Sequence, residues 1–210
     1  MRKPKEPEVN RARIVAAAMA EFAARGFKGA SMDAIAARTR TTRRMINYYF
    51  GGKEPLYLAI LEHVYRGIRE AEQRLSLEHL SPVDAMRHVV GFTFDYYVSH
   101  PAFVSLVVAE NQAGGRYMRK SRAMRSLNVS IIDTLAKVIA RGQREGSFRP
   151  DADPVDVHMA ISALGFFNIA NQHTFGLIFG RDLGARGDVA RRRALVTDIV
   201  LGYLAAGERA

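Results

Sequence analysis

Four side chains of the kinds that read DNA bases stand close together in the amino-terminal quarter of the chain: Arg43, Arg44, Asn47 and Tyr48. Arginine pairs with guanine O6 and N7, asparagine with adenine N6 and N7, and tyrosine contacts a thymine methyl group or a phosphate. Ile46 and Phe50 are four residues apart, so in a helix they share one face and leave the polar set outward. The spacing predicts a helix whose polar face suits the major groove.

Two short helices joined by a turn are expected to position this face. Ser31 is a good N-cap and Asp33 adds a negative charge to the first turn, which predicts a helix from Met32 to about Arg38. Thr42 then caps a second helix over 43–50. This is the pattern of a helix-turn-helix, and it makes double-stranded DNA the expected partner. The alternative is a small helical domain with a solvated basic face.

The basic charge is concentrated around the same segment. Residues 1–53 hold 12 basic and 4 acidic side chains, a net charge of +8, whereas the other 157 residues hold 19 and 17. A local patch of this sign attracts phosphates by counterion release. A membrane surface is the second partner considered, but the first helix has Ala and Ile on its apolar face instead of the bulky residues of an interfacial anchor. We expect no membrane partner.

Composition narrows the remaining classes. The 210 residues include no cysteine and no apolar run long enough to span a membrane, and no apolar export segment is present at the start, so we expect a cytoplasmic protein. The six histidines lack metal-ligand spacing, and neither a phosphate loop nor a Gly-x-Ser-x-Gly elbow is found. We therefore expect no metal, no cofactor and no catalytic residues. The alternative is a helical small-molecule-binding protein or enzyme with a subsidiary nucleic-acid-binding domain.

Helical periodicity continues to the end of the chain and predicts an all-α fold of about nine helices. One long helix is expected from Lys53 to about Leu77 and another over 154–179, with the last over 188–206. We expect a DNA-binding domain over 1–53, with a disordered arm at 1–9, and a ligand-binding and dimerisation domain over 54–210. Aromatic and polar residues embedded in apolar stretches suit an effector pocket, the candidates being Tyr97, Phe103, Glu110, Asn111, Phe167, Asn168 and Asn171. Plain core packing is the alternative for each of them. The arginines at 116, 119, 122 and 125 suit an anionic ligand or, alternatively, solvent.

The segment 10–57 resembles the TetR family of transcriptional regulators. The resemblance is carried by Arg13, Ile14, Ala17, Ala18, Phe22, Gly26-Phe27, Ala30-Ser31-Met32, Ile35-Ala36, Tyr48-Tyr49-Phe50, Lys53-Glu54 and Leu56. The chain departs from the family pattern in the turn, where Thr39-Arg40-Thr41-Thr42 replaces Ala-Gly-Val-Ser, and at Asn47, where the first of two tyrosines is usual.

The resemblance implies a homodimeric repressor that a small-molecule effector releases from a palindromic operator. In such a protein Arg43, Arg44, Asn47 and Tyr48 face bases, while Ser31, Thr42, Tyr49 and Lys53 position the protein on phosphates. The last two long helices of TetR-like proteins form a dimeric four-helix bundle. Here that implies an interface made by Ile161, Gly165, Ile169, Gln172, Val196, Ile199, Val200 and Tyr203. A wholly intramolecular core is the alternative.

Overall fold

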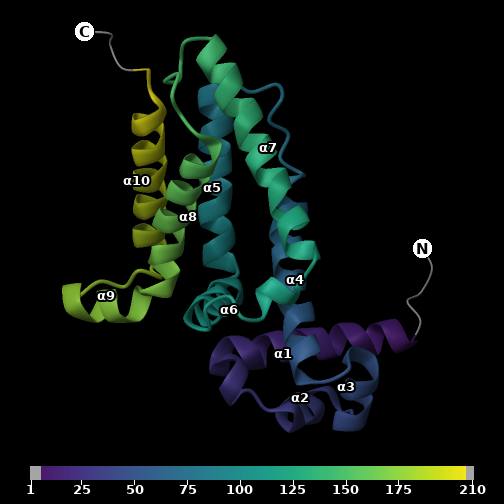
Figure 1. Ribbon diagram of the computed structural model, residues 1–210. Coiled ribbons are helices and arrows are strands. Elements are labelled where there is room, and N and C mark those ends of the chain that lie inside the picture. Colours follow the sequence, from purple (N-terminus) through teal and green to yellow (C-terminus); the bar gives the residue numbers. More distant parts are fainter. Residues whose placement is uncertain (1–5, 207–210) are drawn as a thin grey trace. The chain divides into compact units, whose positions relative to one another are not determined.

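The described part of the chain is helical, as predicted. The computed structural model describes residues 6–206, excluding the side chains of residues 6–9, Arg125 and Asn128. Its ten α-helices and one 3-10 helix (Figure 1) are α1 Glu6–Gly29, α2 Met32–Thr39, α3 Arg43–Phe50, α4 Lys53–Glu72, α5 Pro82–Ser99, α6 Pro101–Gln112, η1 Met118–Lys120, α7 Ala123–Arg144, α8 Pro154–Ala170, α9 Gln172–Phe179 and α10 Arg186–Leu204. The expected all-α class is confirmed.

Three boundaries differ from the sequence prediction. The helix expected over 154–179 is two helices, because the backbone leaves helical geometry at Asn171 (φ −113°, ψ 9°). The helix that starts at Lys53 ends at Glu72 instead of Leu77. At the amino terminus α1 begins at Glu6, inside the range 1–9 expected to be an arm, and residues 1–5 lie outside the described residues.

The described residues form two compact units, and each consists of two separate stretches of the chain. Unit 1 contains the residues up to Arg66 together with Ala102–Arg125, and unit 2 contains Gly67–Pro101 together with the residues from Ser126 onward. Both α4 and α7 therefore have residues in each unit. The expected division into a DNA-binding domain over 1–53 and a ligand-binding and dimerisation domain over 54–210 is a division by function, and it stays a prediction.

Unit 1 is held together by apolar contacts among its first helices and by an aromatic cluster. Ile14, Phe22, Ile35 and Ile46 come from α1, α2 and α3 and are at most 1% exposed. The Phe27 ring lies 5.3 Å from that of Tyr57 and 4.3 Å from that of Tyr117. At Gly26 the backbone turns through a left-handed conformation (φ 62°), which glycine adopts without a Cβ penalty. The resulting core fixes α2 and α3.

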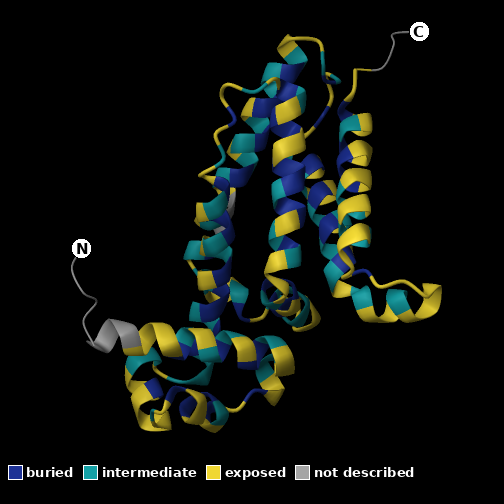
Figure 2. Cartoon of the chain, turned by 180° about the vertical axis from the view of Figure 1, so that it is seen from behind, coloured by how far each residue is buried: buried dark blue, intermediate teal, exposed yellow. Residues whose placement is uncertain are grey.

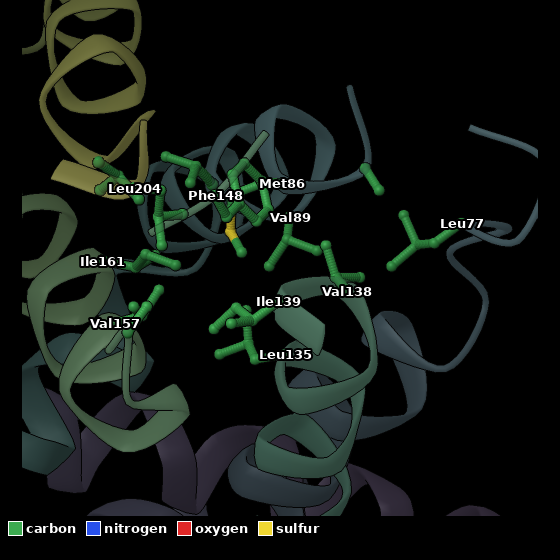
Figure 3. Packing of buried hydrophobic residues seen from close by; sticks show 14 of the residues in the cluster. Leu77, Met86, Val89, Leu135, Val138, Ile139, Phe148, Val157, Ile161 and Leu204 are labelled. Carbon is green, nitrogen blue, oxygen red and sulfur yellow. The ribbon is translucent and has the colours of Figure 1, made fainter. Parts of the chain in front are cut away.

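Unit 2 is a helical bundle with one continuous apolar core. Helices α5, α8 and α10 pack side by side (Figure 1). Figure 3 shows side chains from the core, including Met86 of α5, Leu135 of α7, Ile161 of α8 and Leu204 of α10. Figure 2 shows that each long helix carries a buried stripe beside an exposed one. This pattern is that of amphipathic helices around a shared core.

Candidate nucleic-acid interface and effector region

Side-chain caps fix the two helices of the expected helix-turn-helix. The Ser31 hydroxyl accepts a hydrogen bond from the Ala34 amide at 3.3 Å, and the Thr42 hydroxyl accepts one from the Met45 amide at 3.2 Å. Between them Arg40 adopts the left-handed conformation (φ 52°). Such a conformation costs a residue with a Cβ about 1 kcal/mol or more. The caps predicted at Ser31 and Thr42 are confirmed. The turn between the two helices contains Arg40 in a backbone conformation that is sterically unfavourable for a residue with a Cβ.

The outer face of α3 carries the predicted polar set. Ile46 is fully buried against the unit core, whereas Arg43, Arg44 and Asn47 are exposed and Tyr48 is 79% exposed. The pairs 43/47 and 44/48 are each four residues apart, so they form two adjacent rows on the helix. Met45 is also 38% exposed, and the sequence prediction did not include it. Its apolar side chain can contact a thymine methyl group, as the neighbouring polar groups contact base edges.

The residues expected to contact phosphates are the N-caps of α2 and α3, Tyr49 within α3 and the first residue of α4, and some of their side chains already make contacts within the chain. The Tyr49 ring is half-buried, 5.6 Å from that of Tyr48. The Lys53 ammonium lies 5.0 Å from the Phe27 ring centroid and donates a hydrogen bond to the Lys28 carbonyl at 3.4 Å. Both cap hydroxyls are exposed and keep their O–H donor after accepting the backbone bond. The geometry thus offers a reading helix flanked by hydrogen-bond donors.

Family models match both parts of the chain. The amino-terminal domain of "Bacterial regulatory proteins, tetR family" matches residues 14–60, which include this reading helix. A "Tetracyclin repressor-like, C-terminal domain" matches residues 82–200, more than half of the chain. The protein is a member of the TetR family.

Similar proteins extend the match over nearly the full length. The transcriptional repressor NicS of Pseudomonas putida is 35% identical over 188 residues, which are 90% of this TetR-family chain and 89% of NicS. The repressor SCO4008 of Streptomyces coelicolor is 34% identical over 53% of this chain and 54% of its own. Among solved structures, the regulator SCO4942 of Streptomyces coelicolor has a TM-score of 0.68 at 29% identity, covering 94% of this chain and 99% of its own. A tetR-family protein from Rhodococcus RHA1 shares the fold with a TM-score of 0.74 at 19% identity, over 95% of this chain and 98% of its own.

The predicted effector residues of this TetR-family chain are divided between the two units. Phe103, Glu110 and Asn111 belong to unit 1, whereas Tyr97, Phe167, Asn168 and Asn171 belong to unit 2. The Glu110 carboxylate accepts hydrogen bonds from the backbone amides of Tyr117 (2.7 Å) and Met118 (2.8 Å). Desolvation, followed by the charge of Glu110, raises the pKa of Tyr57 above its ordinary value. Glu110 therefore holds the segment after α6 in place, a role that its position between apolar residues did not reveal.

The other candidates differ in exposure. Asn111 is exposed and its amide donates to the Val107 carbonyl at 3.0 Å. Phe167 is 43% exposed and packs edge-on against Phe175, and Asn171 is the residue that ends α8. The Asn168 side chain is fully buried, and neither of its amide atoms has a hydrogen-bond partner among the described residues.

The Phe103 ring packs edge-on against Tyr65, and the Tyr97 hydroxyl lies 3.4 Å from the Ser162 hydroxyl. In the arginine row, Arg119 donates to the Gly114 carbonyl at 2.7 Å, and the Arg125 side chain lies outside the described residues.

Half of the predicted dimer residues are in the core of their own chain. The side chains of Ile161, Val196 and Val200 are 1–2% exposed, and Gly165 is buried with its Cα side against the Tyr97 ring. These four cannot form an interface with a second copy without unpacking unit 2. Ile169 and Gln172 are half-buried, and of the predicted set only Ile199 and Tyr203 are exposed.

Other apolar residues of α8 and α10 are exposed, and together they are called the outward apolar row. On α8 it consists of Val155, Met159 and Phe167, and on α10 of Leu195, Ile199 and Tyr203, all between 43% and 63% exposed. Members of each row are four or eight residues apart, so they form a ridge along each helix. The sequence prediction did not separate the inward from the outward side of α8, because that helix is apolar on both sides and periodicity does not distinguish them.

A buried ion pair in unit 2 was not predicted. Arg69 and Glu72, in the last turn of α4, are 5% and 6% exposed, and Arg69 Nη1 lies 2.7 Å from Glu72 Oε2. Burial raises the pKa of Glu72 to about 7, against a smaller opposite effect of Arg69. Burial, and then the charge of Arg69, lowers the pKa of His158 on α8 to about 4. An Arg and a Glu three residues apart on an amphipathic helix are typical of a surface pair, so their burial cannot be predicted from their spacing.

No described helix is both long and apolar enough to cross a membrane. No cluster of three or more metal-ligating side chains occurs among the described residues.

Proposed function

We propose that this chain is a transcriptional repressor that binds a palindromic operator in double-stranded DNA as a homodimer and is released by a small-molecule effector. The observation that carries the proposal is the outer face of α3, where Arg43, Arg44, Asn47 and Tyr48 are exposed around a buried Ile46. A helix held by its apolar face, with arginine and asparagine outward, matches the donor and acceptor pattern of base edges in the major groove.

In this proposal the contacts divide into two kinds. The four residues on the face of α3 read bases, and Met45 adds an apolar contact. Ser31, Thr42, Tyr49 and Lys53 contact phosphates and set the orientation of the helix. Selection of bound sites from random duplex DNA tests the proposal directly. A two-fold symmetric product with half-sites about one duplex turn apart supports it, and no enrichment over random sequence contradicts it.

We further propose that the outward apolar row of α8 and α10 is the dimer interface. A row of half-exposed apolar side chains on two adjacent helices is self-complementary when a second copy is related by a two-fold axis, and the four helices then form a bundle. NicS and SCO4008 are both named transcriptional repressors, which favours repression as the output and gives no support to an enzyme. Two identical reading helices are what a palindromic site requires.

A further inference from the structure

The buried ion pair of unit 2 lacks most of the hydrogen bonds that its atoms could make. Nε and Nη1 of Arg69 and both carboxylate oxygens of Glu72 are buried, and none makes a hydrogen bond of acceptable geometry with a described residue. An ion pair removed from water is stable only when its remaining donors and acceptors are satisfied. The ion pair of Arg69 and Glu72 is therefore an incompletely satisfied site within a protein core.

A cleft in unit 2 reaches Glu72, whereas Arg69 is not among the residues that line it. The cleft has a volume of about 360 Å³. Its apolar wall includes Leu75, Leu77 and Val138, of which Leu77 and Val138 are labelled in Figure 3. The volume lies within the range of small-molecule sites, about 300–1,000 Å³. The cleft thus suits a small, partly apolar organic molecule with a polar group directed at the pair.

Three cations, Lys137, Arg141 and Arg144, line the cleft against two acidic residues, Glu72 and Glu78, and this excess of positive charge favours an anion. Lys137 and Arg144 line it and are exposed, so they attract anions from solution. Arg141 also lines it, but its guanidinium donates to the carbonyls of Leu77, Glu78 and Leu80 at 2.7–3.3 Å and is committed to that loop. Arg69 remains the buried cation with unused donors. Its planar guanidinium binds a carboxylate through two parallel hydrogen bonds.

We propose that the effector is a small organic monocarboxylate whose carboxylate binds Arg69 in place of Glu72. This inference rests on the effector response proposed above and assigns the chemical class of the effector. Glu72 occupies the position that the ligand carboxylate takes, so the site holds an internal substitute for its ligand. The raised pKa of Glu72 supports the exchange, because an anion arriving beside it drives proton uptake and leaves the buried site with one negative charge instead of two.

The position of the pair on the chain connects binding to DNA recognition. Arg69 and Glu72 are in the last turn of α4, and the first residue of α4, Lys53, follows α3 after only Gly51 and Gly52. A ligand that pulls Arg69 away from Glu72 acts on the helix that directly continues from the reading helix. Release requires that the ligand bind the DNA-free conformation more tightly than the DNA-bound one.

The test uses two acids and their neutral counterparts with the full-length protein. Benzoate and hexanoate are compared with benzamide and hexanamide by isothermal titration calorimetry slightly above neutral pH. We expect at least one acid to bind about tenfold or more tightly than its amide, since a charge-assisted bond to a buried guanidinium is lost in the amide. In buffers of different ionisation enthalpy, the binding heat of that acid reports proton uptake, which Glu72→Gln removes.

Matched variants separate the site from general effects on folding. Arg69→Met alone leaves Glu72 buried without a counter-charge, so the variant to use is Arg69→Met combined with Glu72→Gln, which keeps the site neutral. We expect it to fold and to lose the preference for acid over amide. Arg66→Met removes an exposed charge from the same helix and is expected to bind as the wild type does.

Three results would overturn the inference. They are equal affinity for acid and amide with both pairs, a preference that survives in the neutral double variant, and proton uptake that persists in Glu72→Gln. Operator titration without ligand keeps the two proposals apart. A protein that binds acids through Arg69 but selects no operator retains the site and loses the repressor function, and one that selects an operator but ignores both acids does the reverse.

Discussion

A negative charge at Ile199 is the most direct test of the proposed dimer interface. Ile199 lies between Leu195 and Tyr203 in the outward row of α10 and is 46% exposed in one chain. Burying a whole aliphatic side chain is worth about 1.5–3 kcal/mol, so covering the exposed half gives about 1 kcal/mol per copy. Ile199→Asp loses this term and adds an unpaired buried carboxylate, which costs about 3–5 kcal/mol.

Two-fold symmetry doubles the effect. Each dimer contains the substitution twice, so the free energy of association is reduced by at least about 8 kcal/mol, or more than about 10⁵-fold in the dissociation constant. The folding of each chain is expected to be little affected, because the aspartate of an isolated chain can reach water at this half-exposed position. Sedimentation velocity and operator titration measure the two consequences, a monomer in solution and loss of tight binding to a palindromic site.

The control is a charge of the same sign on the same helix. Ala194 is exposed and, like Asp198, belongs to a row of α10 that faces away from the apolar one. Ala194→Asp is expected to remain dimeric with wild-type operator affinity. A dimeric Ile199→Asp protein with an unchanged melting temperature would refute the argument and move the interface to another surface.

Three further predictions concern recognition, the turn and pH. Asn47→Ala is expected to cost about 1–3 kcal/mol on the selected operator and to relax base preference at one position, whereas Lys53→Ala should weaken binding to operator and scrambled duplex alike, as measured by parallel titrations. Arg40→Gly is expected to raise the free energy of unfolding by up to about 1 kcal/mol in urea melts by relieving the left-handed conformation, while Arg40→Ala, which also removes the charge, gives no such gain. Because the folded-state pKa of His158 is about 4, below the ordinary 6.5, the unfolded chain binds the extra proton between these values, so His158 lowers stability as pH drops from 6.5 to 4. The raised pKa of Glu72 acts in the opposite direction between about 7 and 4.5, so the test is the difference between wild type and His158→Gln in thermal melts: the variant should gain stability relative to wild type as pH drops from 6.5 to 4, and a constant difference over this range would contradict the prediction.

Local signals predicted the DNA-binding end of the chain well. Ser31 and Thr42 each accept a hydrogen bond from the amide three residues further on, and the burial of Ile46 follows from the helical period alone. Such features depend on neighbours in the sequence, so the sequence contains them in full. The break at Asn171 is also local, but apolar residues continue on both sides of it and no glycine or proline marks it.

Features that depend on packing between distant segments could not be predicted from the sequence. The sequence shows that α8 is apolar, but only its contacts with α5 and α10 decide that Ile161 faces inward and Met159 outward. Glu110 was expected in a pocket, and its bonds to the amides after α6 require a turn whose path the pattern does not specify. Likewise the burial of Arg69 and Glu72 is a property of the bundle around them.

The division of unit 1 into two stretches of chain has a consequence for how the protein is made. During synthesis, residues 67–101 of unit 2 are made between the two stretches of unit 1. The second stretch, Ala102–Arg125, supplies the Tyr117 ring that lies beside Phe27 and Tyr57. A nascent chain that has exposed only α1–α3 therefore lacks part of the aromatic cluster, and the reading helix reaches its final support after more than half of the polypeptide has emerged. Contacts between residues so far apart in sequence also carry a loop-closure cost that slows folding. The recognition module is thus encoded at the start of the chain but completed from its middle.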